Sequence, residues 1–143
     1  MSRYLLDVNV LIALIDVDHA MFERAGSWFH ADPALDWLIC PIVQMGVVRI
    51  MSGPRYSSPL RPAEAMESLR SVTCLGGCRF VADDLDVLDR VAFDDRSMRG
   101  SAHITDTYLL ALAAHHGAAL ATFDARIGTN AVRSSDAEVF LIP

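Results

Sequence analysis

Three aspartates stand at positions where their carboxylates could act together: Asp7, Asp106 and Asp124. Asp7 and Asp124 follow the apolar segments 3–6 and 118–122, which are typical of buried strands. Asp106 lies at the beginning of a strongly apolar segment that is typical of a helix. In a parallel sheet, residues after strands and residues at helix beginnings gather at one edge. We therefore expect the three carboxylates to converge.

Converging carboxylates repel one another unless a cation lies among them. Oxygen ligands alone favour Mg²⁺ or Mn²⁺ over zinc, and such an ion can activate water and offset the charge that develops on a phosphodiester. Each aspartate alone also fits a structural role: Asp7 as a helix cap, Asp106 as a first-turn acid and Asp124 as a turn residue. The prediction of a metal site therefore rests on the three together.

The elements that must position these side chains alternate between strand and helix patterns. Strands are expected at 3–6, 37–40, 79–81, 118–122 and 138–142. Helices are expected at 8–15, 19–30, 42–51, around 65–72, around 85–92 and at 104–116, with a polar loop at 94–103. This alternation predicts an α/β fold with a central, mostly parallel sheet that is covered on both faces.

Composition narrows the possible chemistry. The chain has 143 residues, of which 52% are apolar, and this predicts one compact domain over residues 1–143. The net charge of −6 speaks against a polycation that coats nucleic acid, but it is compatible with carboxylates that hold metal ions. All twelve cationic residues are arginines, which excludes Schiff-base, P-loop and general-base mechanisms that use a lysine.

The cysteines and the hydropathy pattern point to a reduced, soluble protein. Cys40, Cys74 and Cys78 are an odd number without a second CxxC-like partner, so neither a disulfide framework nor a tetrahedral zinc site is favoured. No stretch approaches the roughly 20 apolar residues that span a bilayer, and the beginning of the chain does not resemble a signal peptide. We therefore expect a cytoplasmic protein without a membrane partner.

Four segments carry a resemblance to a known family. They are Leu5-Leu6-Asp7-Val8-Asn9-Val10-Leu11-Ile12, then Asp18-His19 ahead of Trp28-Phe29, then Thr105-Asp106-Thr107-Tyr108-Leu109-Leu110-Ala111-Leu112-Ala113, and then Ala121-Thr122-Phe123-Asp124. In this order they resemble the landmarks of PIN-domain ribonucleases, in particular the VapC-type toxins of bacterial toxin–antitoxin pairs. The resemblance covers nearly the whole chain.

The resemblance implies a three-layer α/β/α fold and an acidic pocket that binds Mg²⁺ or Mn²⁺ and cleaves RNA. Asp7, Asp106 and Asp124 match the catalytic and metal-binding acidic positions of the family. Asn9 and Thr122 match supporting polar positions. It also implies an antitoxin protein as partner and a homodimer.

One family position departs from the usual pattern. Many relatives carry a glutamate on the third helix, where this chain offers Gln44. An amide oxygen can accept a hydrogen bond, but it adds no negative charge and cannot act as a general base. We therefore predict a weaker or single-metal site. Gln44 also leaves open an alternative, a PIN-like module that binds RNA or a protein partner without cleaving RNA.

Arg99, His103 and Arg126 are candidates for contact with RNA, because they lie close in sequence to Asp106 or Asp124 and arginine forks suit phosphate oxygens. The alternative is that the arginines are solvated loop charges or partners of nearby acids.

Two further pairs have structural interpretations. His115 and His116 are expected to interact with the C-terminal carbonyls of their helix rather than with a metal, since adjacent residues point to different faces. Asp83 and Asp84 are expected at the beginning of the helix around 85–92. A phosphoacceptor receiver domain, another small α/β protein with an acidic pocket, is disfavoured because it relies on a lysine.

Overall fold

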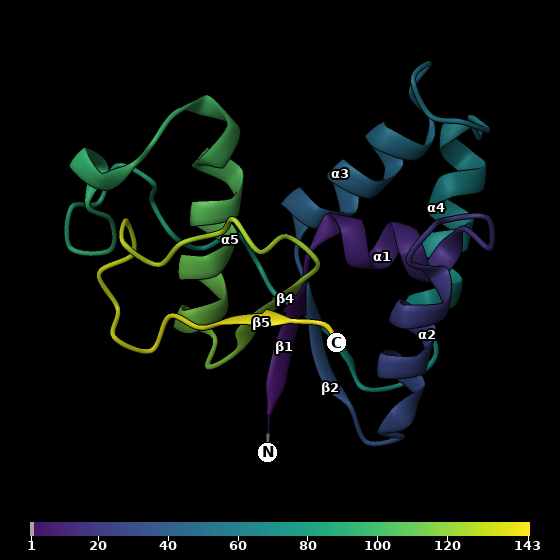
Figure 1. Ribbon diagram of the computed structural model, residues 1–143, viewed down its shortest axis with the longest axis horizontal. Coiled ribbons are helices and arrows are strands. Elements are labelled where there is room, and N and C mark those ends of the chain that lie inside the picture. The colour runs from purple at the N-terminus through teal and green to yellow at the C-terminus, as the bar shows by residue number, and fades with distance from the viewer. Residues whose placement is uncertain (1) are drawn as a thin grey trace.

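The computed structural model describes residues 2–143, and these residues form five strands and five α-helices (Figure 1). Met1, the first residue of the predicted domain, lies outside the described residues. The strands are β1 (Arg3–Leu6), β2 (Asp36–Ile39), β3 (Cys78–Phe80), β4 (Ala119–Thr122) and β5 (Val139–Leu141). The helices are α1 (Val8–Ile15), α2 (Phe22–Ala31), α3 (Pro41–Met51), α4 (Pro62–Thr73) and α5 (Ile104–His115).

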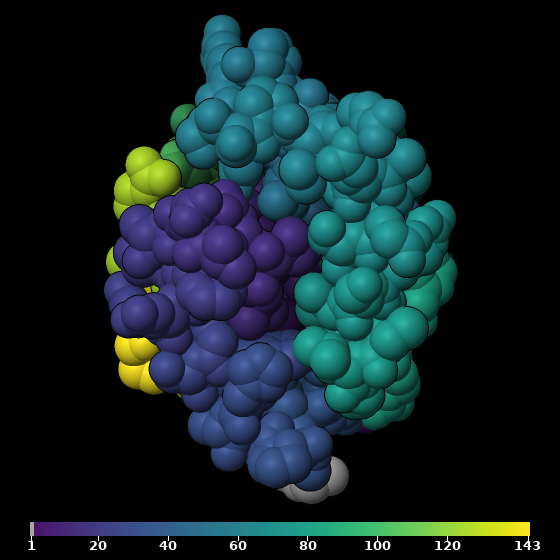
Figure 2. Space-filling model, turned by 90° about the vertical axis from the view of Figure 1, so that its right-hand side faces the viewer, coloured from purple at the N-terminus to yellow at the C-terminus, as the bar shows by residue number. Residues whose placement is uncertain are grey.

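The five strands form one parallel sheet in the order β3-β2-β1-β4-β5, with β1 at its centre. Helix α5 covers one face of the sheet, and α1 to α4 gather on the opposite face (Figure 1). Figure 2 shows this second group from outside, with α2 and α4 on either side of α1. The predicted three-layer α/β/α architecture is confirmed.

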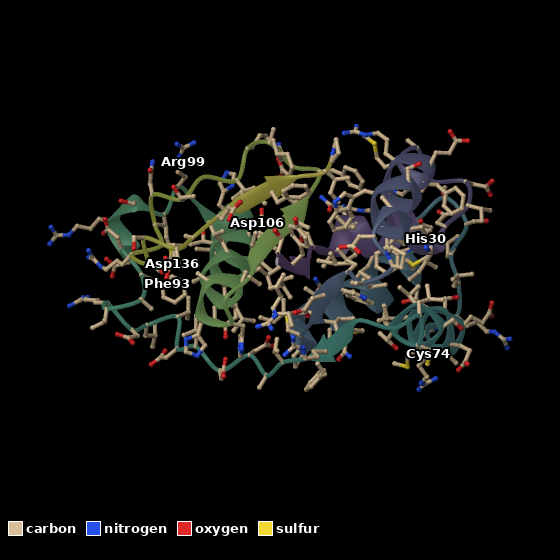
Figure 3. The ribbon with its side chains drawn as sticks, turned by 90° about the horizontal axis from the view of Figure 1, so that it is seen from below. His30, Cys74, Phe93, Arg99, Asp106 and Asp136 are labelled. Carbon is tan, nitrogen blue, oxygen red and sulfur yellow. The ribbon has the colours of Figure 1, made fainter. Side chains whose placement is uncertain are left out.

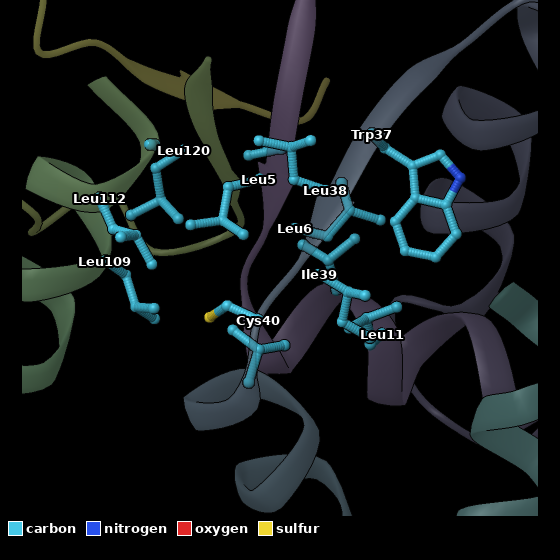
Figure 4. Packing of buried hydrophobic residues seen from close by; sticks show 14 of the residues in the cluster. Leu5, Leu6, Leu11, Trp37, Leu38, Ile39, Cys40, Leu109, Leu112 and Leu120 are labelled. Atoms are coloured by element: carbon cyan, nitrogen blue, oxygen red, sulfur yellow. The ribbon is translucent and has the colours of Figure 1, made fainter. Parts of the chain in front are cut away.

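The sheet is held between its helices by alternating side chains of β1. Leu5 and Leu6 are fully buried, and successive residues of a strand point to opposite faces. Leu5 lies with Leu109 of α5, whereas Leu11 of α1 lies on the other side of the sheet with Trp37 (Figure 4). Each such side chain stabilises the fold by about 1.5–3 kcal/mol when it leaves water.

Two glycines allow backbones to approach each other closely. A Cβ atom on Gly46 of α3 would lie 2.8 Å from a methyl group of Val8, so this glycine lets α3 pack against the beginning of α1. Gly77 has a φ of +72°, and a Cβ atom there would lie 1.9 Å from the carbonyl oxygen of Leu35. The turn before β3 therefore requires glycine for both its conformation and its space.

The predicted helix around 85–92 is wrong, because the segment forms turns. Leu88 and Val91, two of the apolar residues whose spacing indicated this helix, are 83% and 84% exposed. The side chain of Asp86 accepts a hydrogen bond from the backbone N–H of Leu88, and Asp89 does the same for Val91. These local bonds satisfy the backbone in a turn conformation and compete with helix formation.

Smaller differences concern the polar segment 94–103 and the second helix. The segment contains two short 3₁₀ turns, η1 (Asp95–Ser97) and η2 (Ser101–His103), and η2 leads directly into α5. Helix α2 begins at Phe22, three residues later than expected, after a turn in which the His19 ring accepts a hydrogen bond from the N–H of Met21. Within residues 2–143, none of the helices has the length and apolar character that crossing a membrane requires.

Candidate active site

The sheet brings the ends of β1 and β4 together at one edge. Both strands are parallel, and Leu6 pairs with Ala121, so the residues that follow them become neighbours. Asp7 is buried, with 6% of its surface exposed, and its side chain accepts a hydrogen bond from the N–H of Val8 as the N-cap of α1. The capping role and the proposed metal-binding role therefore concern the same carboxylate.

Thr122 is the centre of a polar network at this edge. Its hydroxyl donates a hydrogen bond of 2.8 Å to Oδ2 of Asp7. The hydroxyl oxygen of Thr122 in turn accepts hydrogen bonds from the backbone N–H of Asp124, at 3.1 Å, and from the side-chain amide of Asn9, at 3.4 Å. Thr122 is fully buried, so this network fixes the positions of Asp7, Asn9 and Asp124 relative to β4.

The carboxylates of the site influence one another electrostatically. Burial raises the pKa of Asp7, and the negative charge of Asp124 raises it further, although hydrogen bonds from Thr122 and Val8 act in the opposite direction. Burial also raises the pKa of Asp106, and the charges of Asp7 and Asp124 add to this effect. The three aspartates therefore lie close enough for their charges to act on one another, and we call this group the acidic pocket.

Asp124 differs from the other two because an arginine neutralises it. The guanidinium of Arg126 donates hydrogen bonds of 3.0 Å to both carboxylate oxygens of Asp124. These bonds and the charge of Arg126 lower the pKa of Asp124 below its ordinary value. Arg126 is 82% exposed, so it can leave this ion pair when another cation competes for Asp124.

Two observations fit a divalent cation in this pocket. Oδ1 of Asn9 is buried and has no hydrogen-bond partner, which leaves an oxygen available as a ligand. Asp7 and Asp106 have raised pKa values, caused first by burial and then by nearby carboxylates, and a cation would relieve both costs. The donor set consists of oxygen atoms, which suits Mg²⁺ or Mn²⁺.

A cavity of about 30 Å³ adjoins Asp106 and brings the three RNA-contact candidates together. Arg99 and His103 of the segment 94–103 line it together with Arg126, which follows β4. Figure 3 shows Arg99 and Asp106 on the α5 side of the sheet. Asn130 also lines the cavity, and no motif in the sequence marked this residue.

Gln44 lies in the first turns of α3 and lines a groove between α3 and α4. Met45, Val48 and Met66 form part of the same groove. Its supporting role at the metal site stays a prediction, as do the roles of the other site residues.

Two structural interpretations of the sequence are wrong. The rings of His115 and His116 meet Asp84, with Nε2 of His116 3.0 Å from Oδ1 of the carboxylate. Asp83 does not begin a helix at 85–92; it accepts a hydrogen bond from the N–H of Ile42 at the beginning of α3. Both contacts join residues more than thirty positions apart, so no local pattern could reveal them.

The fold and the acidic pocket agree with comparisons to known proteins. The PIN domain family matches residues 4–132, and the chain therefore belongs to this family. Among curated relatives, Ribonuclease VapC44 of Mycobacterium tuberculosis is 41% identical over 130 residues, which cover 91% of this chain and 92% of the relative. Ribonuclease VapC38 of the same organism is 37% identical over 139 residues, with 96% of each protein covered. The family resemblance inferred from the sequence motifs is confirmed.

Solved structures support the same fold. The crystal structure of Mycobacterium tuberculosis VapC20, described as a Sarcin-Ricin loop cleaving toxin, is similar with a TM-score of 0.61 and 13% identity. It covers 86% of this chain and 91% of that protein. VapBC2 from Rickettsia felis, solved with a DNA fragment from its promoter, has a TM-score of 0.60 at 9% identity and covers 99% of both chains.

Proposed function

We propose that this chain is a metal-dependent endoribonuclease that acts as the toxin of a toxin–antitoxin pair. The observation that carries the proposal is the pocket in which burial and mutual repulsion raise the pKa values of Asp7 and Asp106 beside Asp124. Relatives that carry the name ribonuclease VapC, with identities up to 41% over most of the chain, support the reaction class.

Asp7, Asp106 and Asp124 are the proposed ligands of a Mg²⁺ or Mn²⁺ ion, and together they form the catalytic site. When bound, the ion supplies Lewis-acid activation of water and neutralises charge on the phosphodiester during in-line displacement. Thr122 positions Asp7 through its hydroxyl and the backbone of Asp124 through the N–H bond. Asn9 contributes its unpartnered Oδ1 to the same pocket.

Arg99, His103 and Arg126 are the proposed contacts to RNA. They line one cavity beside Asp106, so a phosphate that reaches the carboxylates passes close to two guanidinium groups and an imidazole. Arg126 has a further part in the proposal: it pairs with Asp124 in the metal-free protein, and a cation held by Asp124 would leave its guanidinium free to bind phosphate.

The proposed partners are an RNA substrate, a cognate antitoxin protein and a second copy of the chain. The similarity in fold to VapBC2 from Rickettsia felis supports the antitoxin. The homodimer and the organisation of residues 1–143 as one PIN domain stay predictions, and the family match over residues 4–132 is compatible with the latter. An RNA-cleaving toxin would act in the cytoplasm, where its substrate is found.

A second candidate function is a PIN-like module that binds RNA or a protein without cleavage. Gln44 favours this binding module, because a neutral amide stands where many members of the family carry a charged glutamate. The ion pair between Arg126 and Asp124 also favours the binding module, because this contact already neutralises one carboxylate without a metal.

Cleavage of a mixed RNA pool by the purified protein, with EDTA, Mg²⁺ or Mn²⁺, separates the two functions. We expect cleavage only with a divalent ion, and we expect it to be lost in Asp7→Ala and in Asp106→Asn. Asp136→Ala, which removes an exposed carboxylate outside the pocket, serves as the matched control and should cleave normally. Absence of cleavage with both ions would favour the binding module.

A further inference from the structure

A second cluster of ionisable side chains lies at the C-terminal end of α5. His115 ends the helix, His116 follows it, and Asp84 comes from the irregular segment 81–94. Nε2 of His116 is 3.0 Å from Oδ1 of Asp84, and Nε2 of His115 is 3.8 Å from Oδ2. One ligand atom from each of the three residues lies within 4.8 Å of the other two.

This compactness distinguishes the cluster from the acidic pocket. Within residues 2–143, three ligand atoms of His, Cys, Asp or Glu side chains lie within 4.8 Å of one another at this cluster. The ligand atoms of the three aspartates in the acidic pocket do not meet this distance. In a tetrahedral zinc site with bonds of about 2.0–2.1 Å, neighbouring ligand atoms are about 3.3 Å apart. The N···O distances of 3.0 Å and 3.8 Å in this cluster lie on either side of that value, so small side-chain rotations would bring the ligand atoms to the spacing of a zinc site.

The donor set selects the kind of ion. Two imidazole nitrogens and one carboxylate oxygen suit Zn²⁺ and similar transition-metal ions rather than Mg²⁺, which prefers oxygen ligands. Burial alone would raise the pKa of Asp84, but the hydrogen bond from His116 and the charges of both histidines lower it overall. The carboxylate is therefore ionised at neutral pH and available as a ligand.

The position of the cluster gives a bound ion a structural effect. Asp84 precedes Leu85, whose backbone N–H and C=O both bond to the hydroxyl of Tyr108 on α5. Further along the same segment, Phe93 stacks on the ring of Tyr108 at a centroid distance of 6.1 Å. An ion held by Asp84 and the two histidines would add a third attachment of this segment to α5.

The geometry points to a Zn²⁺-binding site formed by Asp84, His115 and His116, separate from the acidic pocket. The ion joins the segment 81–94 to the end of α5 and leaves one coordination position for water. This site does not depend on the proposed ribonuclease activity, because none of its ligands belongs to the acidic pocket.

Calorimetric titration with Zn²⁺ alone tests the site, with tag-free protein in a buffer that contains excess Mg²⁺. We expect one equivalent of Zn²⁺ whose affinity falls about tenfold or more in Asp84→Asn and in His115→Gln, because each removes a ligand. Asp106→Asn should retain this equivalent, as should His30→Gln, which removes an exposed histidine from the last turn of α2.

Thermal unfolding gives a second readout, with Zn²⁺ raising the midpoint of the wild type but not of Asp84→Asn. Asp84 and His115 are exposed, so both variants should fold, and circular dichroism checks this. Unchanged Zn²⁺ binding in Asp84→Asn and His115→Gln would overturn the proposal. It would equally be overturned by an absence of Zn²⁺ binding to the wild type, or by loss of the equivalent in Asp106→Asn alone.

Discussion

The two ends of α5 carry clusters of ionisable side chains that differ in composition and packing. At its beginning, Asp106 shares a pocket with Asp7 and Asp124, where burial and like charges raise the pKa values of Asp7 and Asp106. At its end, His115 and His116 meet Asp84 at ion-pair distances. The first cluster gathers three carboxylates, whereas the second places one carboxylate against two imidazole rings. A cation therefore relieves repulsion among carboxylates at the first cluster, whereas at the second it would replace a direct contact between the carboxylate and the imidazoles.

The helix itself contributes to this difference. Asp106 lies in the first turn of α5, where the partial positive charge of the helix favours a carboxylate, and His115 lies in the last turn, where a cation is favoured. Nine residues separate them, or about 14 Å along a helix that rises 1.5 Å per residue. Two sites at this separation can be altered independently.

The largest expected effect is a loss of RNA cleavage in a variant at the beginning of α5, with no loss in a variant at the cluster by its end. Asp106→Asn should lower the rate of Mg²⁺-dependent RNA cleavage about 100-fold or more, because it removes a charge placed where the reaction needs it. Asp84→Asn should leave this rate unchanged. Initial rates on one labelled RNA at a fixed Mg²⁺ concentration measure both. Comparable losses in the two variants would break the separation of the sites.

A smaller effect is expected when the family's usual negative charge is placed at position 44 of α3. Gln44→Glu should raise Mn²⁺ affinity about tenfold, because ligand charge tunes the affinity of oxygen sites for hard cations. Met45→Glu adds the same charge to the next residue of α3, which is 61% exposed, and serves as the control. The assignment of Gln44 to the metal site would be wrong if both variants changed the affinity equally.

Removal of the arginine that pairs with Asp124 should have a more modest effect. Arg126→Gln should raise Mg²⁺ affinity about 2- to 5-fold, the range expected when an exposed ion pair no longer competes for the carboxylate. The same variant should bind a non-cleavable RNA more weakly. Arg55→Gln, at an exposed arginine in the loop after α3, is the control for net charge. Unchanged Mg²⁺ affinity would show that Arg126 does not compete with the ion.

The smallest effect concerns pH and the stability of the metal-free protein. The folded-state pKa of Asp106 is raised by burial and by Asp7 and Asp124, so the folded protein binds more protons than the unfolded chain between about pH 4 and that raised value. The contribution of Asp106 to the free energy of unfolding therefore falls as pH rises through this window. Relative to Asp106→Asn, the wild type should lose stability with rising pH in EDTA.

Urea unfolding of both proteins across this pH range measures the difference, and Mg²⁺ should remove it. A wild type whose stability rises in parallel with that of Asp106→Asn would contradict the raised pKa.

The pocket could be predicted from the sequence because its parts follow general rules. Asp7 comes directly after a buried strand, Asp124 lies two residues beyond another, and Asp106 lies in the first turn of a helix, so a parallel sheet alone brings them to one edge. The alternation of strands and helices also predicted the sheet and its two covered faces. The apolar pattern predicts these strands and helices well, because most of the apolar residues that form the pattern are buried in the core.

Features that depend on competing or distant contacts could not be predicted. The apolar spacing at 85–92 indicated a helix, but Asp86 and Asp89 bond to the backbone two residues further along the chain and hold turns. The meeting of Asp84 with His116 joins residues 32 positions apart, through a segment without regular structure. Spacing rules for adjacent helix positions say nothing about a partner that arrives from another segment.

We propose above all that Asp7, Asp106 and Asp124 together hold the divalent ion. Paramagnetic broadening by substoichiometric Mn²⁺ in amide NMR spectra tests it directly, with Asp106→Asn as control. We expect the amides of 7–9, 105–107 and 122–124 to broaden first, and we expect this pattern to disappear in the variant. Broadening centred on His115 and His116, or spread evenly over the chain, would contradict the account.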